Sequence, residues 1–164
     1  MSSLVTADRL RELLSYDAET GVFVWLVDKS NRVRAGMKLG VRRGDGYVVC
    51  KVDGRRYYVH RLAWFYVHGQ WPCDTIDHIN GNPSDNRIAN LRDVTRSVNA
   101  QNLQRAPRSN KASGLLGVGA KGNRWQAHIK VGGKAKHLGM FAASEDAHAA
   151  YVEAKRRLHP GCQL

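Results

Sequence analysis

The sequence predicts an α+β protein of two small domains joined by a basic linker. Its 164 residues can form one domain or two small ones. Strand-like and helix-like apolar patterns occur in both halves, and the 43% of apolar residues is ordinary for a globular chain. Residues 105–113 carry Pro107 and three cations without an apolar period, as expected of a linker. We therefore expect domains at 1–104 and 114–164.

The first part of the chain is expected to form a helix, a strand, a loop, a hairpin and a second helix. Asp53-Gly54 is a strong signal for a two-residue hairpin turn, and Gly69 is a typical helix end. The expected ranges are 7–14 for the first helix, 22–26 for the strand, 28–44 for the loop, 47–59 for the hairpin and 60–67 for the second helix.

The next elements are expected in the order β-β-α, over a core of about 74–104. Thr75–Ile79 and Leu91–Val94 have the apolar content of short strands, and a long polar loop separates them. A helix is expected from about Thr95 to Gln104.

The C-terminal part predicts a three-stranded antiparallel sheet packed on one helix. The expected strands are 115–118, 124–131 and 136–141. The helix begins at Ser144 with acidic residues in its first turn and ends on Lys155, Arg156 and Arg157, which suits the helix dipole. Its inner stripe is rich in alanine, which lets it lie close to a sheet.

The charge of the chain favours a polyanionic partner. The formal charge is +12 and the pI is near 10.1. Residues 105–164 hold 11 Lys and Arg against 3 Asp and Glu, a net charge of +8, so the C-terminal part is suited to phosphates. We expect double-stranded DNA as the partner and no membrane, because no long apolar run or basic amphipathic helix is evident.

The cysteines favour a reducing compartment. Their number is three, which is odd, and no Cys-x-x-Cys pair occurs, so a disulfide framework and a thiolate zinc site are not expected. No secretion signal is recognised either. The expected location is the cytoplasm.

Asp77, His78 and Asn99 form the candidate catalytic set. Neighbours on a strand point to opposite faces, so Asp77 and His78 can divide two tasks between them. Asp77 and Asn99 offer hard oxygen ligands that suit one Mg²⁺ or Mn²⁺. His78 is a base of suitable pKa for taking a proton from water. Asn90 is expected to brace the loop between the strands.

These motifs resemble the HNH endonucleases, in particular the phage and intron-encoded homing and nicking branch. The resemblance covers roughly residues 16–102, including Val59-His60-Arg61-Leu62-Ala63-Trp64, Asp77-His78-Ile79-Asn80-Gly81-Asn82, Asp85-Asn86-Arg87, Asn90-Leu91-Arg92 and Thr95-Arg96-Ser97-Val98-Asn99. It implies a ββα-metal fold in which His78 is the general base, Asp77 and Asn99 hold the metal, and Asn90 is the central structural Asn. It also implies a phage- or prokaryote-encoded protein in a bacterial cell.

Simpler interpretations compete with this one. Asp77 and His78 beside Asn- and Gly-rich turns are compatible with a hydrogen-bonded loop. His60 is a further candidate for catalysis, but capping or packing at the junction between hairpin and helix explains it better, and we leave it out of the candidate site.

The second strand of the C-terminal sheet predicts a DNA-reading face. Its apolar residues alternate with polar ones, so one face meets the helix and a cationic face stays open. Such a sheet can enter the major groove, where Arg and Gln read base edges and Lys contacts phosphates. The candidate DNA-binding residues are Lys121, Arg124, Gln126, His128, Lys130, Lys136 and His137, together with Arg105 and Arg108 of the linker. A merely solvated cationic face is the competing interpretation.

Residues 113–159 resemble the ethylene-response-factor type of DNA-binding domain. The matching residues are Gly114, Gly117-Val118, Trp125-Gln126-Ala127-His128-Ile129, His137-Leu138-Gly139-Met140-Phe141, Glu145-Asp146-Ala147 and Ala149-Ala150-Tyr151. The resemblance implies that Lys121, Arg124, His128, Lys130 and His137 face the groove, although Gly119 and His137 replace two residues typical of that family.

The sequence thus leads to two hypotheses. The first is a metal-dependent DNA endonuclease of the homing or nicking type, a monomer or weak dimer. A monomer would nick one strand, and double-strand cleavage would need a second copy or a second event. The second is a catalytically inactive, sequence-specific DNA-binding regulator.

Overall fold

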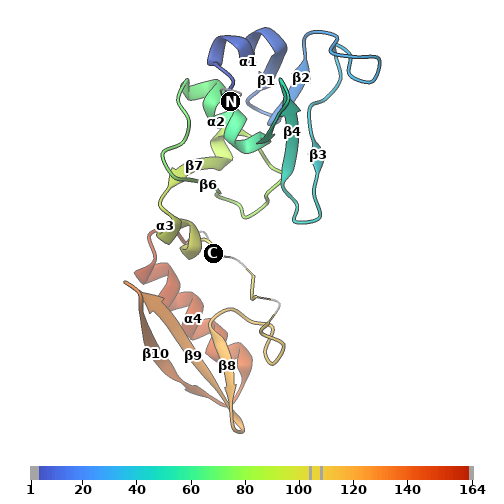
Figure 1. Ribbon diagram of the computed structural model, residues 1–164. Helices are drawn as coiled ribbons and strands as arrows, with labels where there is room; N and C mark the ends of the chain where they lie inside the picture. Colours follow the sequence, from blue (N-terminus) through green and yellow to red (C-terminus); the bar gives the residue numbers. More distant parts are fainter. Residues whose placement is uncertain (1–3, 104, 108, 163–164) are drawn as a thin grey trace. The chain divides into compact units, whose positions relative to one another are not determined.

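The computed structural model describes residues 4–103, 105–107 and 109–162. The protein is α+β: small antiparallel sheets and α-helices follow one another along the chain (Figure 1). Two compact units are present, Met1–Thr95 and Arg96–Leu164. No helix of the described residues is long and apolar enough to cross a bilayer.

The first unit begins with helix α1 (Ala7–Leu13) and a hairpin of β1 (Leu14–Asp17) and β2 (Val22–Trp25). The hydroxyl of Thr6 caps the helix by accepting from the backbone N–H of Arg9 at 3.2 Å. The hairpin turn has Gly21 at φ +71°, where a Cβ would lie 2.4 Å from the backbone nitrogen of Arg87. Only glycine therefore lets this turn press against the loop around Asn86 and Arg87.

A three-stranded antiparallel sheet and helix α2 (Val59–His68) follow. The strands are β3 (Val41–Arg42), β4 (Val48–Val52) and β5 (Arg55–Tyr58), in the order β3-β4-β5. The predicted turn at Asp53-Gly54 is present, with both residues at positive φ as a type I′ turn requires. Helix α2 ends at Gly69 in the left-handed conformation, which confirms the predicted helix end.

The last hairpin of the first unit joins β6 (Thr75–His78) to β7 (Leu91–Val94) across a long loop with a single 3₁₀ turn, η1 (Ile88–Asn90). The carboxylate of Asp93 accepts from the backbone N–H groups of Cys73 and Asp74, which fixes the start of β6. Ile76 and Leu91 turn inward and join one apolar core with α1, α2 and the other strands. The hairpin is therefore anchored on its apolar face, and its polar residues keep a fixed orientation.

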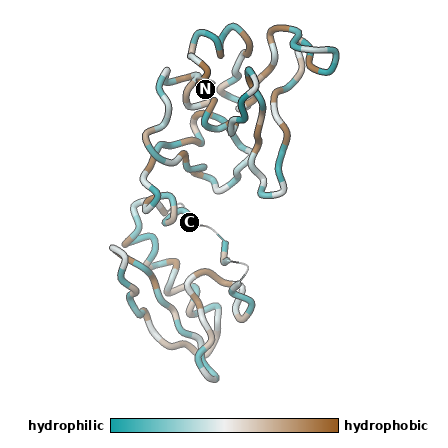
Figure 2. The backbone as a smooth tube through the Cα atoms, in the orientation of Figure 1, coloured by the Kyte–Doolittle hydropathy of each residue, from teal (hydrophilic) through white to brown (hydrophobic). Residues whose placement is uncertain are grey.

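The second unit contains helix α3 (Arg96–Gln101), strands β8 (Val118–Lys121), β9 (Arg124–Val131) and β10 (Lys134–Phe141), and helix α4 (Ser144–Leu158). The sheet order is β10-β9-β8, and all pairs are antiparallel. The tip between β8 and β9 is hydrophilic (Figure 2), as the sequence Lys121-Gly122-Asn123-Arg124 requires. The predicted antiparallel sheet with one helix is therefore present.

Helix α4 covers one face of this sheet. Ala147 packs on Val118 and Ala127, whereas Tyr151 and Ala154 pack on Ile129. Gly117 lies under this helix at φ +72°, and a Cβ there would be 1.9 Å from the ring of Tyr151. The glycine is required for the close contact of helix and sheet.

Several predicted boundaries differ from the structure. The first strand of the C-terminal sheet begins at Val118 and not at Leu115, because Asn110 donates hydrogen bonds to the carbonyls of Leu115 and Val118 and holds the preceding residues in a turn. β1 and β3 were not expected. Helix α3 ends at Gln101, and it belongs to the second compact unit.

Candidate functional site

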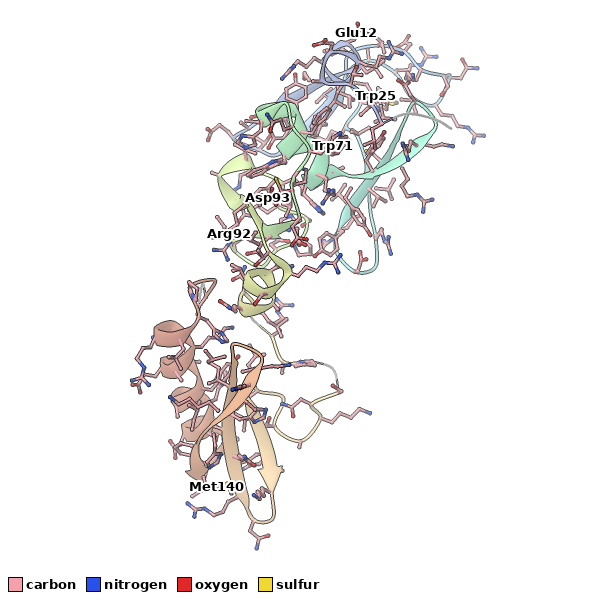
Figure 3. All side chains as sticks on the ribbon, turned by 60° about the vertical axis from the view of Figure 1, so that its left-hand side comes forward. Glu12, Trp25, Trp71, Arg92, Asp93 and Met140 are labelled. Atoms are coloured by element: carbon pink, nitrogen blue, oxygen red, sulfur yellow. The ribbon has the colours of Figure 1, made fainter. Side chains whose placement is uncertain are left out.

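Asp77 and His78 lie at the end of β6, and both side chains are buried with 5% exposure. In the β6–β7 register Asp77 pairs with Arg92 and His78 with Leu91. Because successive residues of a strand alternate between faces, the two side chains are directed to opposite sides of the hairpin. Figure 3 labels Arg92 and its neighbour Asp93 on β7.

The loop after β6 is held by a network of amide hydrogen bonds. The side chain of Asn90 accepts from the backbone N–H of Asn80 at 3.0 Å and donates to the carbonyl of Asp85 at 2.8 Å. The backbone carbonyl of Asn90 accepts from the N–H of Ile79 at 2.9 Å. Arg87 donates to the carboxylate of Asp85 and lowers the pKa of that carboxyl to about 2. Asn90 thus links both ends of the loop that follows His78.

His78 is oriented by Asn86, which is itself 4% exposed. The Nε2 of His78 lies 3.3 Å from the Oδ1 of Asn86. Since an amide oxygen only accepts, this bond requires a proton on Nε2 and makes Nδ1 the basic nitrogen. Burial lowers the pKa of His78, while the bond to Asn86 and the charges of Asp77 and Asp85 oppose the shift. A neutral imidazole is therefore favoured.

Asn86 is fixed from two further sides. Its side-chain Nδ2 donates to the backbone carbonyl of Ser84 at 3.4 Å, and its backbone carbonyl accepts from the hydroxyl of Tyr16 at 2.7 Å. Tyr16 lies on β1, next to the turn in which Gly21 contacts this same loop. The first hairpin of the chain thus supports the residue that orients His78.

Asp77 forms a partly buried ion pair with Arg92. The Oδ2 of Asp77 accepts from Nε of Arg92 at 2.8 Å and lies 2.7 Å from its Nη2. Charge-assisted pairs of this kind hold a carboxylate in one rotamer. A cation bound through Oδ2 would share that oxygen with a guanidinium.

Aromatic rings and a second imidazole surround His78. The His60 ring meets the His78 ring edge-on, with centroids 5.1 Å apart, and the Tyr47 ring lies 5.4 Å from His60 and 5.9 Å from His78. Tyr58 stacks on the other side of His60 at 5.4 Å. Burial lowers the pKa of His60 to about 3, and among the described residues its Nδ1 has no hydrogen-bond partner. His78 therefore borders a cluster of packed rings.

The remaining predicted ligand, Asn99, is half-buried on α3. The structure brings Asp77 and His78 together in the first compact unit, whereas Asn99 belongs to the second. No group of three or more His, Cys, Asp or Glu side chains in the described part of the chain could hold a metal ion. The predicted ligands are one carboxylate and one amide, which suit Mg²⁺ or Mn²⁺. This pair is not a group of that kind, because it has two members and Asn is not one of the four residue types.

In the second unit, the polar residues of β9 lie on the sheet face opposite α4, since Ala127 and Ile129 between them are buried against the helix. His128 pairs with His137 across the strands, and Lys121 pairs with Arg124. The Nε2 of Gln126 lies 3.1 Å from Nδ1 of His137. We call this surface the open face; it consists of Lys121, Arg124, Gln126, His128, Lys130 and His137.

Lys136 is not part of the open face. It pairs with Ile129, whose side chain packs on α4, so Lys136 is an exposed residue at the helix side of the sheet. Arg105 is exposed, and Arg108 lies outside the described residues.

Comparison with known families supports the nuclease interpretation. Residues 57–101 match the family model described as HNH endonuclease. Neither the comparison with curated proteins nor that with solved structures gives a match. The matched segment runs from β5 to α3 and contains His60, Asp77, His78, Asn86 and Asn99. The match supports the predicted HNH nuclease domain over these residues, and with it a nuclease activity with DNA as the implied substrate class.

Sequence reasoning missed three residues that contact His78 in the structure: Asn86, His60 and Tyr47. Asn86 and His60 occur within motifs of the HNH resemblance, so the motif itself was a usable signal for them. Nothing in the local sequence marks Tyr47, because it approaches His78 from a different sheet.

Proposed function

We propose that this protein is a divalent-metal-dependent DNA endonuclease of the HNH type, with a second unit that binds DNA. The observation that carries this proposal is the buried Asp77–His78 pair on β6, inside the segment that matches the HNH endonuclease model. A structural loop has no need of a neutral histidine buried beside a carboxylate, whereas phosphodiester hydrolysis needs both groups.

In the proposed reaction His78 takes a proton from the attacking water at Nδ1. The hydrogen bond from Nε2 to Asn86 supports this assignment, because it fixes the tautomer and the plane of the ring. Asp77 and Asn99 would hold one Mg²⁺ or Mn²⁺ in a ββα-metal arrangement of β6, β7 and α3. When bound, such an ion stabilises the charge that develops on the phosphate and on the departing 3′ oxygen.

His60, Tyr47 and Tyr58 act as positioning residues in this proposal. The rings of His60 and Tyr47 contact His78 and limit the rotation of its imidazole, and Tyr58 supports His60 by stacking on it. Burial of His78 lowers its pKa, which keeps it neutral and available as a base.

The second unit is proposed to hold DNA through the open face. Its cations are exposed, and the polar alternation of β9 presents Arg124, Gln126, His128 and Lys130 in one row. Arg105 and Arg108 of the linker are also proposed to contact phosphates, as is Lys136 on the helix side of the sheet. In this proposal the protein is a cytoplasmic phage or prokaryotic enzyme of the homing or nicking kind, active as a monomer or weak dimer.

Nicking of supercoiled plasmid in Mg²⁺ or Mn²⁺ tests the proposal. Wild-type protein should convert the plasmid to the open-circular form, and His78→Ala should lower the rate by at least about a thousandfold while DNA affinity stays within twofold. His68→Ala is the matched control, since His68 is an exposed histidine at the end of α2. Equal rates for wild type and His78→Ala would refute the assignment of the base.

One observation favours the second hypothesis, a DNA-binding regulator without activity. The guanidinium of Arg92 already neutralises Asp77, as expected of a site that binds no cation. The same plasmid assay separates the two functions. Wild-type protein that binds DNA but never nicks it, with either metal, would be a regulator.

A further inference from the structure

A cavity of about 350 Å³ on the first unit has no role in the proposed reaction. Three arginines and three aromatic residues line it: Arg55, Arg56, Arg61, Tyr57, Tyr58 and Trp71. Its described lining includes no Asp or Glu. Arginines without a carboxylate among the described lining residues suit the cavity to an anion.

The position of Arg56 destabilises the pairing of β4 and β5. In the β4–β5 register it lies directly opposite Lys51, and both side chains are exposed. Like charges in facing positions destabilise a strand pair. The carboxylate of the adjacent turn, Asp53, pairs with Arg9 and Lys29 and so does not relieve this repulsion. Stability of the hairpin therefore does not account for Arg56.

The walls of the cavity are rigid. Trp71, labelled in Figure 3, stacks on Phe65 at 4.3 Å and on Tyr57 at 5.7 Å, with nearly parallel rings. Arg61 donates from Nη1 to the carbonyl of Asp74 at 3.1 Å, which limits the freedom of its guanidinium. Binding an anion here costs little side-chain entropy, because these groups are already ordered.

The cavity adjoins the candidate site through ring contacts. Tyr58 lines the cavity and stacks on His60, and His60 meets His78. The Tyr58 hydroxyl also accepts from Nη1 of Arg43 at 3.2 Å, which adds a fourth cation next to the cavity. An anion bound here would therefore lie on the same part of the first unit as His78.

We propose that this cavity binds a backbone phosphate of DNA, with Arg56 and Arg61 as its ligands and Tyr58 against the adjoining sugar. The choice of DNA as the occupant rests on the proposed function. Arginine suits this task because its planar fork matches two phosphate oxygens at once. The contact would add to affinity at a phosphate other than the one that is cleaved.

The test measures DNA affinity against salt concentration in the full chain, in EDTA and in a His78→Ala background, so that no cleavage occurs. The test variants are Arg56→Gln and the double variant Arg56→Gln/Arg61→Gln. Arg32→Gln is the matched control: it removes the same charge from an exposed loop position of the same unit. A thermal unfolding curve for each variant verifies the fold.

Arg56→Gln should weaken binding about tenfold and reduce the slope of log K against log salt by about 1. The double variant should reduce the slope by about 2, and Arg32→Gln should leave the slope unchanged. The proposal would be overturned if Arg56→Gln kept the wild-type slope of log K against log salt. It would also be overturned if Arg32→Gln reduced that slope as much as Arg56→Gln does.

This experiment is independent of the nuclease proposal. Binding is measured without metal and in a variant that lacks His78, so an inactive wild type would leave the result intact. Conversely, wild-type nicking remains measurable if the cavity contributes nothing. The two proposals can therefore fail separately.

Discussion

In the first unit Asp77, His78 and Asn86 are each at most 5% exposed, whereas Arg124, His128 and Lys130 of the second unit lie exposed on the open face. The first group is tied by an ion pair, an imidazole–amide bond and ring contacts. The second group is carried by a sheet whose other face is fixed by α4. Burial restricts orientation and shifts pKa values, which suits catalysis. Exposure keeps cations hydrated and adaptable, which suits phosphate binding.

The strongest test of this contrast is to remove the buried carboxylate. Asp77→Asn keeps the shape of the side chain but loses the negative charge, and we expect nicking to fall by about a thousandfold or more. Affinity for DNA in EDTA should stay within twofold. Removal of metal by EDTA should abolish nicking by the wild type in the same assay. Activity in Asp77→Asn near that of the wild type would contradict a role of Asp77 in metal binding.

The buried imidazole of His60 predicts a pH dependence of stability. Its pKa is about 3 in the folded protein, against an ordinary value of 6.5. Below pH 6.5 His60 is protonated in the unfolded chain but stays neutral in the folded chain. The free energy of unfolding therefore falls as the pH falls. The expected slope from this group approaches about 1.4 kcal/mol per pH unit between its two pKa values.

Denaturant unfolding from pH 7 to pH 4 measures that slope. In His60→Gln the free energy of unfolding should depend less steeply on pH, because up to about one proton fewer is taken up on unfolding. This expectation holds even if the variant is less stable than the wild type at pH 7. His68→Gln, at an exposed histidine, should retain the wild-type dependence. Parallel curves for wild type and His60→Gln would show that His60 is not held neutral by burial.

A smaller effect is expected at Asn86. Asn86→Ala removes the hydrogen bond that selects the tautomer of His78, and nicking should fall about 10- to 100-fold without a change in DNA affinity. Asn82→Ala, an exposed residue of the same loop, is the control and should cost less than threefold. Identical losses in both variants would indicate general damage to the loop.

The smallest expected effect is the difference between cationic residues on the two faces of the C-terminal sheet. Lys130→Gln on the open face should lower the salt slope of DNA binding by about 1, and Lys136→Gln on the helix side should lower it less. Anisotropy titrations at several salt concentrations measure both slopes. A larger effect at Lys136 than at Lys130 would place the DNA on the other side of the sheet.

The sequence by itself was sufficient for the α+β class, the hairpin at Asp53-Gly54, the end of α2 at Gly69 and the β-β-α order around Asp77. These features depend on local chemistry: glycine at positive φ, alternation of apolar residues and a compact motif. The HNH resemblance could be stated for the same reason, because its motifs are nearly contiguous in the chain.

Only the tertiary structure decided which residues surround His78 and which cations share a face. Asn86 reaches His78 because the β1–β2 turn presses on its loop at Gly21, and His60 and Tyr47 reach it from α2 and from the end of β4. Lys136 lies on the helix side through its register with Ile129 and so does not share a face with its neighbour His137. Such contacts join residues far apart in the chain, and they depend on how the apolar core orients each element.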